Sequence, residues 1–170
     1  DLVVLAGHSA GGQFVQRYAV AGQAPTMLSQ HGIHTRFVVA NPSSYLYFDT
    51  RRLTEHGFAP FPRMRCRGFD HYKYGLEAPN AYVAAQTPQA LMSHYARQQV
   101  IYLLGTLDAD AAHPFLDRSC AAEAQGPTRL ARGQAYYRYL SVVLGHDVGK
   151  RQHRVLVEGV GHDHQGMFQS

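Results

Sequence analysis

The chain has 170 residues, of which 45% are hydrophobic and 16% are charged, and its net charge is +4 at pH 7. This composition fits one globular domain or part of one, and the low charged fraction argues against a disordered tail. No apolar run approaches the ~20 residues of a membrane-spanning helix, so we expect no membrane span.

The first predicted strand, residues 2–6, leads directly into a glycine-rich turn at residues 7–12 (GHSAGG). Gly7, His8, Ser9 and Gly11 fit G-x-S-x-G, the pattern of a nucleophile elbow, which raises a serine on a sharp turn between a strand and a helix. Small residues around the serine allow a backbone conformation that side chains would block. A glycine-rich turn with an incidental serine is the alternative. The β-branched strand before the turn, and a predicted helix after it that ends near residue 21, favour the elbow.

A second strand is predicted at residues 35–40, and residues 51–86 then carry Pro, Gly and aromatic residues without clear periodicity. Basic residues lie among the aromatic ones there: Arg63, Arg65, Arg67 and Lys73. This mixture is also found in nucleic-acid-binding proteins, but no nucleic-acid motif accompanies it. We therefore interpret it as a loop with inward-facing aromatic residues and expect no nucleic-acid partner.

The second half of the chain predicts two helices and two strands. Thr87 and Pro88 are typical of a helix start, and this helix should end near Arg97. A strand follows at residues 99–104, a helix at 128–144 that ends before Gly145, and a last strand at 153–158. The apolar side of the 128–144 helix is predicted to consist of Leu130, Tyr137, Leu140, Val143 and Leu144. Strands that alternate with helices indicate a parallel sheet in an α/β fold.

Chemically reactive side chains follow three of the predicted strands. Ser9 follows the first, Asp108 lies three residues after Gly105, and His162 comes directly after Gly161. Functional groups gather at the carboxyl ends of strands in open α/β sheets, so these three should meet. Asp110 and Asp117 are alternatives for the acid, and His164 is the alternative for the histidine. Two histidines two residues apart on a loop are weak grounds for a metal site, so we expect neither a metal nor a cofactor.

The elbow, the Gly-x-x-Asp turn and the terminal Gly-Val-Gly-His-Asp, in the order Ser, Asp, His, resemble the α/β-hydrolase superfamily. The resemblance covers nearly the whole chain, but it corresponds to strands five to eight of that family's eight-stranded core. It implies a partial α/β-hydrolase domain over residues 1–170, with about four mostly parallel strands, flanking helices and a lid or cap at residues 51–86. Members with Gly-Asp-Ser-Ala-Gly-Gly are near in pattern, but His8 replaces that Asp, so the chain is not placed among them.

The same resemblance implies a serine hydrolase of carboxylesterase or lipase type, acting on a small-molecule ester. Ser9 would attack the carbonyl carbon, His162 would carry the proton, Asp108 would orient the imidazole, and the Ala10 N–H would be one oxyanion donor. The family's second donor comes from a part of the fold that this chain lacks, and such a loss costs about 2.7–4 kcal/mol of barrier. Residues 1–170 alone should therefore be a poor catalyst, and a non-catalytic domain is the alternative. We expect His8 to pack beside the elbow.

Aromatic residues in the 51–86 segment would shape the acyl or alcohol pocket if that segment is a lid; the alternative is a structural excursion that only covers the sheet. These residues are Phe58, Phe61, Phe69, Tyr72 and Tyr74.

The chain opens on Asp1, one residue before a strand, and looks like the C-terminal part of a longer protein. The first strand should then lie at the end of a sheet whose order follows the sequence, and its open edge should make the chain prone to aggregate. Cys66 and Cys120, the only cysteines, are either two free thiols or a disulfide, and a disulfide would indicate an oxidising compartment. The sequence otherwise gives no indication of localisation or oligomeric state.

Overall fold

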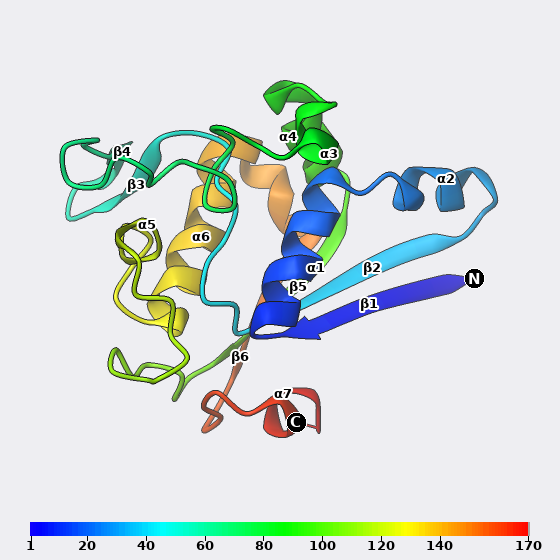
Figure 1. Ribbon diagram of the computed structural model, residues 1–170. Helices are drawn as coiled ribbons and strands as arrows, with labels where there is room; N and C mark the ends of the chain where they lie inside the picture. Colours follow the sequence, from blue (N-terminus) through cyan, green and yellow to red (C-terminus); the bar gives the residue numbers. More distant parts are fainter. Residues whose placement is uncertain (170) are drawn as a thin grey trace.

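The computed structural model describes residues 1–169, and its centre is a parallel sheet of four strands (Figure 1). The strands lie in the order β1 (Leu2–His8), β2 (His34–Ala40), β5 (Gln99–Gly105), β6 (Gln152–Val157). This confirms the predicted α/β class and the predicted order, with β1 at the end of the sheet. β1 runs two residues beyond its predicted end because its backbone stays paired with β2 as far as His8 and Ala40.

Seven α-helices and one 3-10 helix connect and flank these strands in the described part of the chain. They are α1 (Ala10–Ala21), α2 (Ala24–Gln30), α3 (Ala81–Ala84), α4 (Pro88–Ala96), α5 (Cys120–Glu123), α6 (Arg129–Leu144), η1 (His146–Lys150) and α7 (His164–Gln169). Helices α1, α4 and α6 lie on one side of the sheet and α7 lies on the other (Figure 1). The main core forms on the first side, where Val15, Tyr95 and Tyr136 pack against Phe37 and Tyr102 of the sheet.

The buried side of α6 differs from the predicted one. Leu140 is buried as predicted, but Leu130 and Tyr137 are only partly buried, and Arg129 and Arg132 are buried. Arg132 donates to the carbonyl oxygens of Gly126, Ser43 and Asp117. Tyr136 and Tyr139 are fully buried, and their hydroxyl groups bond to the backbone of residues 46 and 48–49. Hydrogen bonds to distant backbone groups thus offset the cost of burying polar side chains, which a hydrophobic pattern does not reveal.

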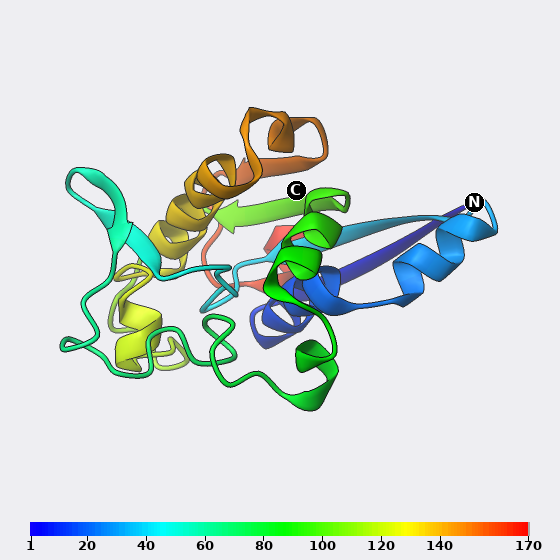
Figure 2. The same ribbon diagram turned by 90° about the horizontal axis from the view of Figure 1, so that it is seen from above.

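The 51–86 segment begins with an antiparallel hairpin, β3 (Arg51–Thr54) and β4 (Gly57–Pro60), which the sequence did not predict. A disulfide joins Cys66 to Cys120 with the two Cα atoms 5.8 Å apart. Phe69 is fully buried beside this bond and packs against Phe61. Figures 1 and 2 both place the hairpin and α5 at one end of the molecule, opposite α2 and the N-terminus. β1 points toward that same end, so the hairpin and α5 lie beyond the carboxyl ends of the strands, whereas α3 (residues 81–84 of the segment) lies beside α1 (Figure 1).

Candidate active site

Ser9 stands on a strained turn between β1 and α1. Its backbone has φ 56° and ψ −117°, a left-handed conformation that costs a residue with a side chain about 1–3 kcal/mol. The Ser9 N–H donates to the Ala40 carbonyl at 2.9 Å, which ties the turn to β2. This geometry lifts the hydroxyl away from the sheet, as the G-x-S-x-G pattern indicates.

Two glycines give this turn the space it needs. A Cβ on Gly7 would lie 2.4 Å from the Gly11 backbone, and a Cβ on Gly12 would lie 2.7 Å from the Ala40 carbonyl oxygen. Both distances are below any real Cβ contact. A Cβ on Gly11 would meet nothing within 4 Å, so its crowded neighbour Gly12, rather than Gly11 itself, needs to lack a side chain.

The structure brings Ser9, His162 and Asp108 together at the carboxyl edge of the sheet. His162 Nε2 lies 2.9 Å from Ser9 Oγ, and His162 Nδ1 lies 2.8 Å from Asp108 Oδ2. An ionised carboxylate only accepts hydrogen bonds, so Nδ1 carries the ring proton and Nε2 is free to accept from the serine hydroxyl. The arrangement can take a proton from Ser9.

The alternative acids and the alternative histidine are engaged elsewhere. Asp110 accepts from the Ala112 N–H, and Asp117 accepts from the Tyr74 hydroxyl and pairs with Lys73. The His164 ring lies beside His8, with 6.3 Å between ring centroids. None of these three makes a hydrogen bond to Ser9 or His162 in the described residues.

Two histidine rings surround His162. His8 lies 4.6 Å from it between ring centroids and His113 lies 5.1 Å away. Burial, followed by the nearby His162, lowers the pKa of His8 to about 4. His8 is therefore neutral at pH 7 and adds no positive charge beside the catalytic candidate.

Burial also lowers the pKa of His162, and the hydrogen bond that His162 donates to Asp108 opposes this shift without cancelling it. Arg129 and His113 add smaller effects in the lowering direction. His162 is thus mostly a free base at neutral pH, which is the form that accepts a proton.

Arg129 is a residue of this site that the sequence did not indicate. Its side chain is fully buried, and its Nη1 donates to Asp108 Oδ1 at 3.1 Å while Nε donates to Ser43 Oγ at 2.9 Å. Asp108 therefore has one oxygen on Arg129 and the other on His162. The only sequence signal is an arginine in the first turn of a helix, which is too common to predict such a contact.

Asn41 also belongs to this site, in a role that the sequence did not indicate. It is fully buried directly after β2 with φ 43°. Its Oδ1 accepts from the Gly105 N–H at 2.9 Å, and its Nδ2 donates to the Gly161 carbonyl at 3.0 Å. Gly105 begins the turn to Asp108 and Gly161 precedes His162, so one side chain holds both loops. Its position at a strand end was visible in the sequence, but its partners were not.

Ala10 follows Ser9 directly and begins α1. As the first residue of α1, it has an N–H without a helical acceptor, at the positive end of the helix dipole. This places a backbone donor next to the Ser9 hydroxyl.

A cleft of about 620 Å³ opens beside Ser9. Its lining comes from the elbow and the start of α1, from the loop after β2, from the 51–86 segment and from residues 114–117. The lining residues are Ser9, Ala10, Gln13, Ser43, Lys73, Tyr74, Pro114, Phe115, Leu116 and Asp117. Of the aromatic residues predicted to shape a pocket, Tyr74 alone lies in this lining, whereas Tyr72 lines a different hollow beside Phe14.

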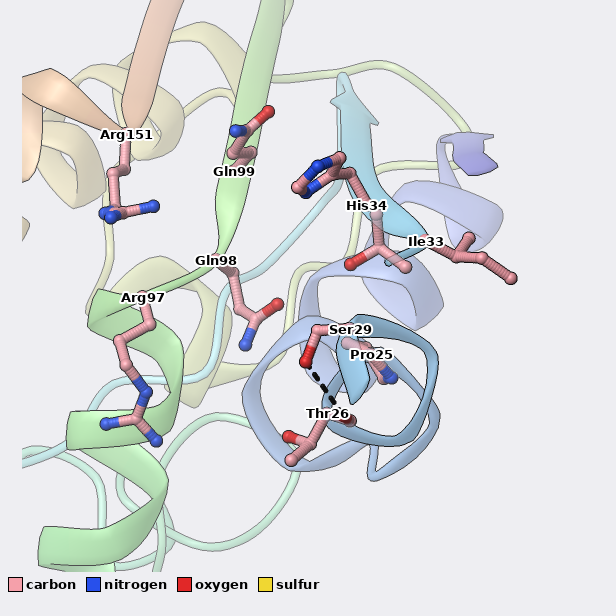
Figure 3. A pocket seen from close by; sticks show the side chains of 10 residues that line it. Pro25, Thr26, Ser29, Ile33, His34, Arg97, Gln98, Gln99 and Arg151 are labelled. Atoms are coloured by element: carbon pink, nitrogen blue, oxygen red, sulfur yellow. Dashed lines mark hydrogen bonds between the residues drawn. The ribbon is translucent and has the colours of Figure 1, made fainter. Parts of the chain in front are cut away.

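A separate polar hollow of about 270 Å³ lies at the amino ends of β2, β5 and β6, the opposite end of these strands (Figure 3). Arg97, Arg151, His34 and Ser29 line it, but no serine there contacts a histidine. Among the side chains that the structure describes, no group of three His, Cys, Asp or Glu is arranged to hold a metal ion. No helix in this range is long and apolar enough to cross a membrane.

Comparison with known proteins finds similar solved structures, including the following two. Poly(aspartic acid) hydrolase-1 from Sphingomonas sp. KT-1 is 28% identical with a TM-score of 0.64, and the match covers 96% of this chain and 51% of that one. LpqC, a poly(3-hydroxybutyrate) depolymerase from Bordetella parapertussis, is 26% identical with a TM-score of 0.65, covering 98% and 46%. The chain thus spans about half the length of these proteins. No protein-family model matches it, and no curated protein matches it significantly. The parallel sheet in its predicted order, the turn at Ser9 and these two similarities show that the chain belongs to the α/β-hydrolase superfamily and has part of that family's fold.

Proposed function

We propose that this protein is a serine hydrolase that cleaves carboxylic esters through an acyl-enzyme. The observation that carries the proposal is the continuous chain of hydrogen bonds from Ser9 Oγ through His162 to Asp108, at 2.9 and 2.8 Å. Nucleophile, base and orienting acid within this reach are the mark of an activated serine.

In the first half of the reaction, Ser9 Oγ attacks the ester carbonyl carbon while His162 Nε2 takes its proton. The Ala10 N–H stabilises the negative oxygen of the tetrahedral intermediate. When the intermediate collapses, the ester C–O bond breaks and His162 returns the proton to the leaving alkoxide. Water then repeats the sequence on the acyl-Ser9, which releases the carboxylic acid and restores the serine.

Asp108 and Arg129 set up this proton transfer. Asp108 holds the Nδ1–H of His162 and stabilises the imidazolium that forms when Nε2 is protonated. Arg129 holds the second carboxylate oxygen of Asp108, which keeps the acid pointed at the ring.

We propose residues 51–86 as a cap over the substrate. The β3–β4 hairpin of the segment lies beyond the carboxyl ends of the strands, and Lys73 and Tyr74 of the segment line the cleft beside Ser9. The two similar enzymes are named for a poly(aspartic acid) and a poly(3-hydroxybutyrate), so a polymer with carbonyl-containing repeats is the substrate class that their names suggest for this chain.

We also propose that the protein works in an oxidising compartment. The Cys66–Cys120 disulfide supports this, because disulfides persist chiefly in exported proteins and in oxidising organelles.

The test is a pre-steady-state assay of the full-length protein with 4-nitrophenyl acetate. We expect a burst of one molecule of 4-nitrophenol per enzyme molecule, followed by slower turnover. Both the burst and the turnover should be lost in Ser9→Ala. Ser29→Ala is the matched control, because Ser29 is exposed on α2 and its hydroxyl bonds only to the Thr26 carbonyl. Equal rates in wild type and Ser9→Ala would refute the proposal and favour a non-catalytic domain.

A further inference from the structure

Gln13 lies one helical turn after Ser9 and shares its cleft. The Gln13 N–H donates to the Ser9 carbonyl at 3.0 Å, which makes it the first residue to close a turn of α1. Residues four apart lie on the same face of a helix, about 6 Å apart along its axis. Ser9, Ala10 and Gln13 accordingly line the same cleft. The catalytic roles proposed above leave the Gln13 side chain unused.

A hydrogen-bond network fixes which way the Gln13 amide points. The buried Arg17 donates through Nη2 to Ser44 Oγ at 3.1 Å, and an arginine can only donate. The Ser44 hydroxyl must therefore direct its own hydrogen elsewhere, and its partner is Gln13 Oε1 at 2.9 Å. The amide oxygen faces Ser44, so the NH₂ group faces away from it. Within the described residues no acceptor is bonded to Gln13 Nε2.

The same arginine also holds the part of the cleft wall that Lys73 forms. Arg17 Nε and Nη2 donate to the Lys73 carbonyl at 3.1 and 2.8 Å. The Lys73 ammonium lies 3.6 Å from Asp117, so the charge of that wall is compensated. The Gln13 NH₂ group is therefore a neutral donor in a cleft where the charge of Lys73 is already balanced by Asp117. This favours a neutral oxygen acceptor over a carboxylate.

We propose that Gln13 is a specificity-determining residue whose NH₂ group binds a second, neutral carbonyl oxygen of the substrate beyond the scissile ester. The substrate class is thus an ester whose acyl chain carries another ester or amide carbonyl. This inference rests on the proposed function, because it needs an acyl group delivered to Ser9.

The experiment compares two substrates of matched length in the full-length protein: the mixed methyl 4-nitrophenyl ester of adipic acid, which has a second carbonyl, and 4-nitrophenyl octanoate, which has none. The measured quantity is the ratio of their kcat/KM values, in which intrinsic ester reactivity cancels between variants. We expect Gln13→Met, which removes the donor but keeps an unbranched side chain, to lower this ratio about fivefold, the worth of one neutral hydrogen bond.

Two further variants make the result decisive. Gln13→Glu keeps the size of the side chain and still accepts from Ser44, but it presents an oxygen in place of the NH₂ group, so the ratio should fall at least as far. Gln23→Met is the matched control, because Gln23 is exposed just before α2 and does not line the cleft, and it should leave the ratio unchanged.

The outcomes separate this inference from the proposed function. A ratio that is unchanged in both Gln13 variants, with turnover that still depends on Ser9, overturns the role of Gln13 alone. An equal fall in Gln23→Met also overturns it, since the effect would then not come from the cleft. If Ser9→Ala hydrolyses the substrates at the wild-type rate, the proposed function itself is refuted, and the proposed role of Gln13 is refuted with it.

Discussion

Two opposing effects determine the pKa of His162, and this pKa sets the pH range of the proposed reaction. Burial lowers its pKa below the usual 6.5, and Asp108 pulls it back up. A base works in its unprotonated form, so activity should be lost as the pH falls through the pKa of His162. We expect kcat/KM for a neutral ester to have an acidic limb with its midpoint below pH 6.5, measured across a pH series at constant ionic strength.

Arg129 provides a test of that balance. Its positive charge lowers the pKa of His162, so removing the charge in Arg129→Gln should move the acidic limb to higher pH. Arg129→Lys keeps the charge and should leave the limb near its wild-type position. Breaking a buried ion pair costs about 3–5 kcal/mol, so the folded fraction of each variant should be checked by circular dichroism. A limb at the same pH in both variants would contradict the electrostatic role of Arg129.

Asn41 gives the second prediction at the residue scale. In Asn41→Asp the acceptor for the Gly105 N–H remains, but the donor to the Gly161 carbonyl is replaced by a carboxylate oxygen. The carboxylate oxygen would then face the Gly161 carbonyl oxygen, and neither atom can donate a hydrogen bond. An unsatisfied buried polar group lowers the stability of the fold by about 1–3 kcal/mol, and by more when it is charged. We expect a lower free energy of unfolding in urea and a larger fall in kcat than rise in KM, because the Asp108 and His162 loops lose their common partner.

Asn80→Asp is the control for that measurement. Asn80 caps α3 by accepting from the Val83 N–H, and an aspartate does the same. Its stability and kcat should stay near wild type. If Asn41→Asp behaves like Asn80→Asp, the bridge between the two loops has no measurable effect.

At the scale of elements, Gly11 and Gly12 of the elbow look equivalent in the sequence but have different amounts of space around them. In Gly12→Ala the new Cβ would lie 2.7 Å from the Ala40 carbonyl oxygen, a backbone atom at the end of β2 that is held by the Ser9 N–H. In Gly11→Ala it would meet nothing within 4 Å, and alanine favours a helix by up to ~1 kcal/mol over glycine.

We therefore expect Gly12→Ala to lower the melting temperature and the activity sharply, while Gly11→Ala is neutral or slightly stabilising. Thermal unfolding followed by circular dichroism, together with ester hydrolysis, measures both. Equal losses in the two variants would mean that the steric requirement lies elsewhere in the turn.

The regular elements were predictable where local pattern determines them. β-branched apolar runs mark β1 and β2, and the Thr87 and Thr128 caps mark the starts of α4 and α6. The hairpin β3–β4 was missed because four-residue strands carry too little pattern. The wrong face of α6 has another cause, because its buried Arg132 depends on carbonyl groups far away in the sequence, and its buried Arg129 on the side chains of Ser43 and Asp108.

The candidate site shows the same division. Ser9, Asp108 and His162 follow strand ends in the sequence, so the parallel sheet alone implies that they meet. Asn41 and Arg129 act through hydrogen bonds across 64 and 21 residues, and no local pattern encodes such partners. Residues that orient other residues are therefore visible only in the structure.

On the scale of the whole molecule, the sheet is covered unequally. Helix α7 covers a small part of the second face, where its Met167 packs against Ala40 and Val157. Leu2 and Val4 of β1 each remain 50% exposed. β1 also pairs with β2 on one side only, and no strand of the described residues pairs with its other edge. An apolar strand with a free edge is a template for pairing with another chain.

We therefore expect residues 1–170, expressed alone, to self-associate through β1. Size-exclusion chromatography with light scattering at micromolar concentration should show species larger than the monomer. Val4→Lys places a charge on the exposed strand and should shift the population toward monomer, because a charge on an edge strand opposes pairing. Val142→Lys is the matched control: Val142 is 49% exposed but lies on α6, away from the edge, and the same charge there should change little. A monomeric wild-type chain would contradict the prediction, and so would an equal response to both lysines, since general solubility rather than the β1 edge would then govern association.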